Sequence, residues 1–116
     1  MSDSKDYVSR TDELGNIHIS EEVLAAISAA AALEVEGVSS LTNPGKKNAA
    51  KRIHIKLEEE KAVVSLSVLM TYGHTIPEMG KAVQEAVKNA IESMTGLEVA
   101  AVNVSVGGIV FPPKEQ

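Results

Sequence analysis

The stretch AVVSLSVLMTYGHTIPEMGKAVQEAVKNAIESMTGLEVAAVNVSV, residues 62–106, decides the fold of this chain. It begins with apolar and small polar residues in alternation, which is typical of a strand with one buried face. In residues 76–94 the apolar positions are three and four apart, which predicts one buried stripe on a helix. The stretch ends in a second alternating run, where valines are separated by Asn103 and Ser105. A strand, a helix and a strand therefore follow one another.

The residues just before this stretch predict a hairpin. RIHIKLE, residues 52–58, alternates in the same way and is separated by few residues from the next strand, so the two should pair antiparallel. The inward side chains expected from the longer strand are Val64, Leu66, Val68, Met70 and Tyr72.

The N-terminal part predicts a short strand and a first helix. NIHIS, residues 16–20, places Ile17 and Ile19 inward and His18 outward. Ser20 is the expected N-cap of a helix that ends near Gly37. A further short strand is expected directly after this glycine. The apolar line expected on the helix is Val23, Ile27, Ala30 or Ala31, and Val35.

These elements predict an α+β fold in the order β-α-(β)-ββ-α-β. Two helices should pack on one face of a four- or five-stranded mixed or antiparallel sheet, giving a two-layer sandwich. We expect one domain over residues 15–111, with a disordered tail at 1–14 and a short C-terminal tail at 112–116.

Composition excludes several classes of site. The chain has no cysteine among its 116 residues, so disulfides and thiolate metal sites are absent, as is usual in a reducing compartment. A net charge of −5 argues against a dedicated nucleic-acid binder. The three aromatic residues, Tyr7, Tyr72 and Phe111, are too few to line a ligand pocket or stack bases.

The sequence also predicts a cytoplasmic location. The N-terminus is polar and mixed in charge, unlike a signal peptide. The most apolar helical run, VLAAISAAAAL, is too short to span a bilayer. Any attachment to a membrane should therefore be peripheral or through a partner.

The outward positions of the strands form the candidate interaction surface. If the helices cover one face of the sheet, the other face carries small and polar side chains. It is either an ordinary solvated face or a platform for a protein partner or a second copy. Its expected members are His18, His54, Lys56, Ser65, Ser67, Asn103 and Ser105.

Motifs for chemistry are weak throughout. His18 and His54 with Asn103 could form a two-histidine metal site, but no HExxH motif is present and such a site is disfavoured. GHTIPEMG lacks the ending of a phosphate loop. The loop GKKNAAKR is either solvated or binds anionic lipid or an acidic partner, and nucleic acid is disfavoured. Its basic residues are Lys46, Lys47, Lys51 and Arg52.

The turn before the second helix, TYGHTIPEMG, combines residues that resemble an active-site loop. Most have structural roles: Thr75 is the expected N-cap with Glu78 completing a capping box, and Pro77 fits the first turn. Only His74 has no structural role, and we expect it to be an exposed contact residue.

Taken in order, the motifs resemble the alkaline shock protein family of envelope stress response proteins, which is common in Gram-positive bacteria. The resemblance covers about residues 15–111 and depends on the ordered set rather than on any one motif. The matching positions are Ile17, Ile19, Ser20 and Val23; Val35, Gly37 and Val38; Tyr72, Gly73 and Ile76; Val83, Gln84 and Val87; Met94–Leu97; and Val102–Val106.

The resemblance implies a cytoplasmic, non-enzymatic protein of cell-envelope homeostasis with no cofactor or small-molecule substrate. Some members of the family self-associate into higher assemblies, and some are held at the membrane by a small anchoring protein. An alternative is a regulator that binds an enzyme of fatty-acid synthesis such as acetyl-CoA carboxylase. A small nucleic-acid binder acting through the basic loop is a third alternative.

Overall fold

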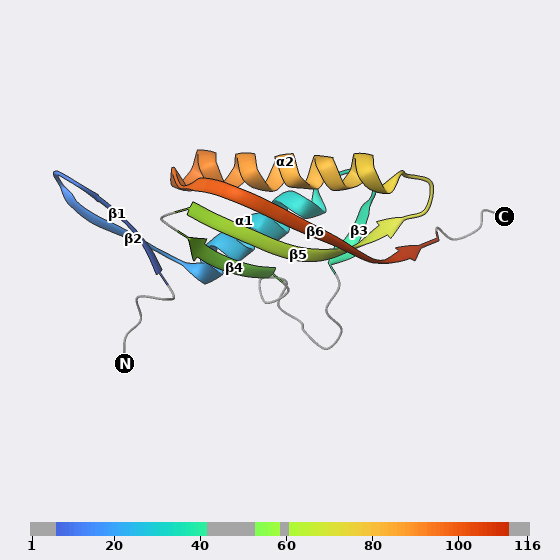
Figure 1. Cartoon of the computed structure of the whole chain (residues 1–116), viewed down its shortest axis with the longest axis horizontal. Coiled ribbons are helices and arrows are strands. Elements are labelled where there is room, and N and C mark those ends of the chain that lie inside the picture. Colours follow the sequence, from blue (N-terminus) through green and yellow to red (C-terminus); the bar gives the residue numbers. More distant parts are fainter. Residues whose placement is uncertain (1–6, 42–52, 59–60, 112–116) are drawn as a thin grey trace.

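The structure is a computed structural model that describes residues 7–41, 53–58 and 61–111 (Figure 1). These residues form two helices and six strands, which confirms the α+β class predicted from the sequence. In chain order the elements are β1 (Tyr7–Asp12), β2 (Gly15–Ser20), α1 (Glu21–Leu33), β3 (Val38–Leu41), β4 (Ile53–Glu58), β5 (Lys61–Thr71), α2 (Ile76–Thr95) and β6 (Glu98–Val110).

Strand β5 is the centre of a four-stranded mixed sheet. Along one edge it pairs antiparallel with β4 through its first half and with β3 through its second half. Along the other edge it pairs parallel with β6 over its whole length. The predicted hairpin of β4 and β5 is therefore confirmed. The register between β5 and β6 shifts after Val106, so β6 has an irregularity at Gly107.

Both helices cover the same face of this sheet, which makes the predicted two-layer sandwich. Alternate residues of β5 from Ala62 to Met70 point into the layer between sheet and helices and are buried. Helix α2 packs on them with one stripe, in which each member is one helical turn from the next. The stripe is Met79, Val83, Val87 and Ile91.

The N-terminal hairpin differs from prediction. Residues 7–12 belong to the expected disordered tail but form β1, which pairs antiparallel with β2. This pair is a separate two-stranded sheet that projects to one side of the sandwich (Figure 1). Because β2 does not join the main sheet, Ile17 has no core to enter and is 56% exposed, contrary to the inward position predicted for it.

Helix α1 begins as predicted but presents another face to the core. Ser20 is its N-cap, and its hydroxyl accepts a hydrogen bond from Val23 N at 3.2 Å. Val23 itself is 47% exposed, whereas Ile27, Ala31 and Val35 of the predicted line are partly buried and pack against the core. The most deeply buried residues are mostly small and lie one or two positions further along the helix: Leu24, Ala25, Ser28, Ala29 and Ala32.

Helix α2 confirms its predicted C-cap and corrects its N-cap. Gly96 ends the helix with φ of 77°, a left-handed conformation that glycine adopts without strain. Thr75 occupies the N-cap position, but its side chain makes no capping hydrogen bond, so the predicted capping box is absent. Ile76 and Met94, expected on the buried stripe, are 49% and 71% exposed because they lie at the two helix ends.

Candidate interaction face

We use the name open face for the side of β4, β5 and β6 that the helices leave uncovered. Its centre is a row of three residues from the three strands, since His54 pairs with Ser65 and Ser65 pairs with Asn103. Asn103 Nδ2 donates a hydrogen bond to Ser65 Oγ at 3.4 Å. The sequence-predicted residues of these strands therefore meet on one surface.

Around this row the open face is small and balanced in charge. Lys56 lies beside Val63, and Ser67 lies beside Ser105. At one end Lys61 Nζ is 3.6 Å from Glu98 Oε2, and Lys56 Nζ is 3.2 Å from Glu58 Oε2. Exposed ion pairs of this kind add little stability. Because each pair joins a lysine to a glutamate, neither sign of charge dominates this end of the open face.

Two groups of predicted site residues are not brought to the open face. His18 lies on β2 in the separate hairpin, so the prediction that it shares a face with His54 is wrong. The four basic residues at 46–52 lie outside the described residues. The two-histidine site with Asn103 is therefore not assembled, since one histidine is in another sheet.

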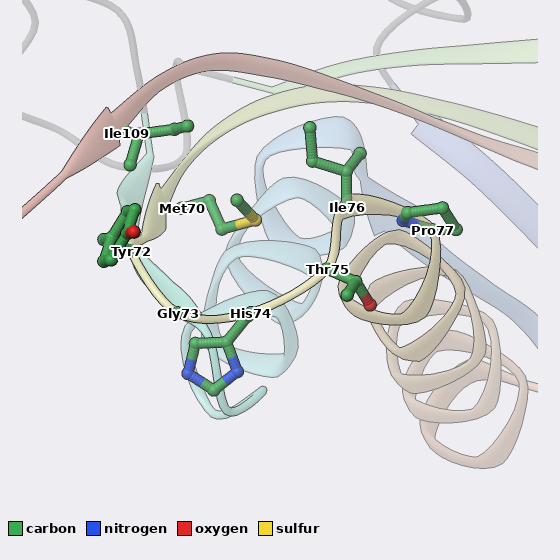
Figure 2. A pocket seen from close by; sticks show the side chains of 8 residues that line it. All are labelled: Met70, Tyr72, Gly73, His74, Thr75, Ile76, Pro77 and Ile109. Carbon is green, nitrogen blue, oxygen red and sulfur yellow. The ribbon is translucent and has the colours of Figure 1, made fainter.

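The turn between β5 and α2 opens into a shallow apolar hollow of about 560 Å³ (Figure 2). Met70 lies between Tyr72 and Ile109 on one side and Ile76 and Pro77 on the other. Tyr72 is 60% exposed rather than inward, because β5 ends at Thr71 and the chain turns away. Its ring stacks on that of Phe111 with 4.8 Å between the ring centroids.

His74 has a structural contact that the sequence did not reveal. In Figure 2 its ring lies at the rim of the hollow and points away from Met70. It lies instead against Gly37, where an added Cβ would be 3.1 Å from His74 Cγ and 3.2 Å from Met79 Cγ. Gly37 also has φ of 104°, which a side chain would strain. His74 therefore packs on the turn that follows α1 while remaining exposed.

Polar side chains of α2 bind the backbone of β6, an arrangement that sequence analysis missed. Gln84 Nε2 donates to the carbonyl of Val102 at 3.0 Å, and Val99 N donates to Glu92 Oε2 at 3.0 Å. Lys88 Nζ also donates to Glu92, at 2.8 Å. The bonds from Lys88 and from Val99 lower the pKa of Glu92 below its ordinary value of 4.5. In the sequence these residues are indistinguishable from a solvated helix face.

Metal-ligating side chains do not cluster within the described residues. No group of three His, Asp or Glu side chains in that part of the chain is placed to hold a metal ion. Neither described helix combines the length and apolarity needed to cross a bilayer. What the described surface does offer is contact area: the open face, the apolar hollow and the edge of β6.

Comparison with known proteins gives the family. Residues 9–111 match the model of the alkaline shock protein 23 family, which is described as having a cell envelope-related function. The chain belongs to the alkaline shock protein 23 family. This confirms the resemblance seen in the sequence, and the match extends into β1, which the predicted domain left out.

Two relatives from Gram-positive bacteria match nearly the whole family domain. The uncharacterised protein Spy1535 of Streptococcus pyogenes is 35% identical over 107 residues, covering 86% of this chain and 83% of its own. The uncharacterised protein YqhY of Bacillus subtilis is 30% identical over 112 residues, covering 89% of this chain and 83% of its own.

Among solved structures, a MamM CTD variant has a similar fold. The M250L form superposes with a TM-score of 0.51 at 16% identity, covering 75% of this chain and 95% of that one. At such low identity the likeness concerns the arrangement of helices and strands alone.

Proposed function

We propose that this alkaline shock family chain is a non-enzymatic interaction protein of the cell-envelope stress response. It works from the cytoplasm through self-association and through a membrane-anchored partner. The family match over residues 9–111 carries the proposal, because it supplies the link to the cell envelope. The open face supports it: a surface on which Ser65 and Ser67 lie between Val63 and Leu69 suits contact with another protein better than it suits a reaction.

A matched pair of variants tests the role of the open face. Ser67→Arg places a long cation next to the central row of the open face, where Ser67 is half-buried beside Ser105. Ser93→Arg makes the same change on the exposed side of α2. Each variant is expressed in cells of the native type, and the fraction that sediments with membranes is measured.

We expect the unaltered chain and Ser93→Arg to sediment with membranes and Ser67→Arg to lose that association. A chain that stays in the supernatant in every background would refute the membrane-anchored partner. Recovery of acetyl-CoA carboxylase subunits on chemical crosslinking, with no membrane protein, would replace the proposal with the regulator of fatty-acid synthesis. Equal sedimentation of both variants would move the contact away from the open face.

A further inference from the structure

The outer edge of β6 is divided into two unlike halves. Within the described chain β6 pairs only with β5, so one side of its backbone faces away from the sheet. Along the first half α2 covers that side, since Gln84 binds the Val102 carbonyl and Glu92 binds the Val99 N–H. A further strand is therefore blocked from this half of the edge.

The second half of the edge has no such cover. Residues two apart in a strand direct their backbone groups to the same side, so Val104 and Val106 face outward as Val102 does. No side chain of the described residues hydrogen-bonds these outward groups. In Figure 1 this half of β6 runs out from beneath α2 towards the C-terminal end. It is an open template for another strand.

The opposite edge of the sheet is protected, which makes the β6 edge distinctive. There the sheet ends in β3, of four residues, and β4, of six residues. The side chains of β4 on the open face include Lys56 and Glu58. Short strands and charges are the usual means of preventing edge-to-edge pairing. By contrast β6 has 13 residues and carries no charge after Glu98 and no proline.

We propose that the second half of β6 pairs antiparallel with the same segment of a second copy, across a two-fold axis at Ser105. Gln84 already binds the Val102 carbonyl. The next residues whose backbone N–H and C=O groups face away from β5 are therefore Val104 and Val106. A two-fold axis that exchanges these two residues passes through Ser105 and lets each pair share both its hydrogen bonds. The two sheets become one, and the two open faces become continuous.

A second copy of this chain fits this edge, because the segment that would pair with it is itself uncharged. Each chain has a net charge of −5, so two copies repel each other wherever acidic surfaces meet. Pairing about Ser105 brings together only uncharged residues, with Asn103 facing Gly107 and valine facing valine. This inference rests on the self-association in the proposed function and names the surface responsible for it.

Single cysteines test the pairing directly, because the chain has none of its own. At the two-fold axis Ser105 faces its own copy in a non-hydrogen-bonded pair, with about 4.5 Å between Cα atoms, which is within the range of a disulfide. Ser105→Cys should therefore form a crosslinked dimer under mild oxidation. The control is Ser67→Cys, on the same face but on the central strand. Equal crosslinking of the two variants would overturn the pairing.

A second pair of variants removes one backbone donor. Val104→Pro deletes an outward N–H, a change that edge strands tolerate, while Val104→Ala keeps the N–H and shortens the side chain. Sedimentation velocity should show dimerisation weakened roughly tenfold or more by proline and retained with alanine. If circular dichroism shows that the proline variant is unfolded, the cysteine pair decides the question.

The two proposals fail in distinguishable ways. Association that persists in folded Val104→Pro, with no preference for Ser105→Cys, refutes the β6 edge and leaves self-association standing. An unaltered chain that remains a monomer refutes both. A monomer whose β6 edge binds a strand of a different protein also counts against a second copy as the occupant.

Discussion

Substitution of Gly37 by alanine tests the packing and backbone strain of the turn that follows α1. Gly37 follows α1, is buried, and has φ of 104°. Its carbonyl accepts a hydrogen bond from Thr71 N at 2.8 Å, which ties the turn to the end of β5. Any side chain at this backbone conformation costs on the order of 1–3 kcal/mol.

Crowding adds to that strain. The new Cβ would lie 3.1 Å from His74 Cγ, 3.3 Å from His74 Nδ1 and 3.2 Å from Met79 Cγ. The exposed imidazole can move aside, whereas Met79 is 3% exposed and held in the core. Packing an extra methyl group into such a place costs about 1–3 kcal/mol. We therefore expect Gly37→Ala to lower the free energy of unfolding by about 2–6 kcal/mol.

Urea denaturation followed by far-ultraviolet circular dichroism measures this loss in a chain without tryptophan. The experiment is repeated in a His74→Ala background, where the ring is absent. There the cost of the same substitution should fall by about 1 kcal/mol, since neighbouring residues couple. A loss below about 0.5 kcal/mol in the native background would refute the strain at Gly37. Equal losses in both backgrounds would show that His74 does not pack on it.

Three further predictions concern the helices. Ser20→Ala should cost about 1 kcal/mol of stability because it removes the hydrogen bond from Val23 N. Thr75→Ala should cost less than about 0.5 kcal/mol because the Thr75 side chain makes no capping bond. Equal urea midpoints for the two variants would contradict this difference. Val87→Ala empties part of the core at a fully buried position and should cost about 2 kcal/mol in the same assay, and a change near zero would place Val87 at the surface. Glu92→Gln should destabilise the protein near neutral pH but not in acid. Because the folded pKa is depressed, the carboxylate stabilises the fold above its ordinary pKa of 4.5 and loses that effect as pH falls through the folded value. A difference between the two proteins that does not change from about pH 7 to pH 3 would contradict the assignment.

The sheet was predictable because apolar residues recur at every second position of its strands. From Ala62 to Met70 every second residue is apolar and buried, and the turn to β4 is short, so sequence alone defines the hairpin and its inner face. The same alternation placed Asn103 and Ser105 outward, on the open face. Strong periodicity survives folding because a slip of one residue would reverse both faces.

Helix α1 was less predictable because its sequence offers little contrast. Between Val23 and Leu33 no residue is charged, and six are alanines, so the apolar surface extends around the helix. Periodicity cannot select one face under those conditions. The choice is made by tertiary packing, which buries Ala25, Ala29 and Ala32 where α1 lies close to the sheet and to α2.

The N-terminal hairpin was missed for lack of a turn signal. The chain reverses between Asp12 and Gly15 through Glu13 and Leu14, which are not residues typical of a two-residue turn. Leu14 is 97% exposed, so it belongs to no buried apolar pattern from which the hairpin could be predicted. The hydrogen bonds that Gln84 and Glu92 make with the backbone of β6 were also missed. In the sequence both residues belong to the polar face of α2, which is typical of a solvated surface.

Sedimentation velocity on the unaltered chain, over a roughly hundredfold range of concentration, tests the central claim most directly. Our account of a self-associating interaction protein predicts a shift from monomer to dimer as concentration rises. Ser105→Cys should trap that dimer and Ser67→Cys should not. A sedimentation coefficient that stays at the monomer value throughout the range would contradict the account.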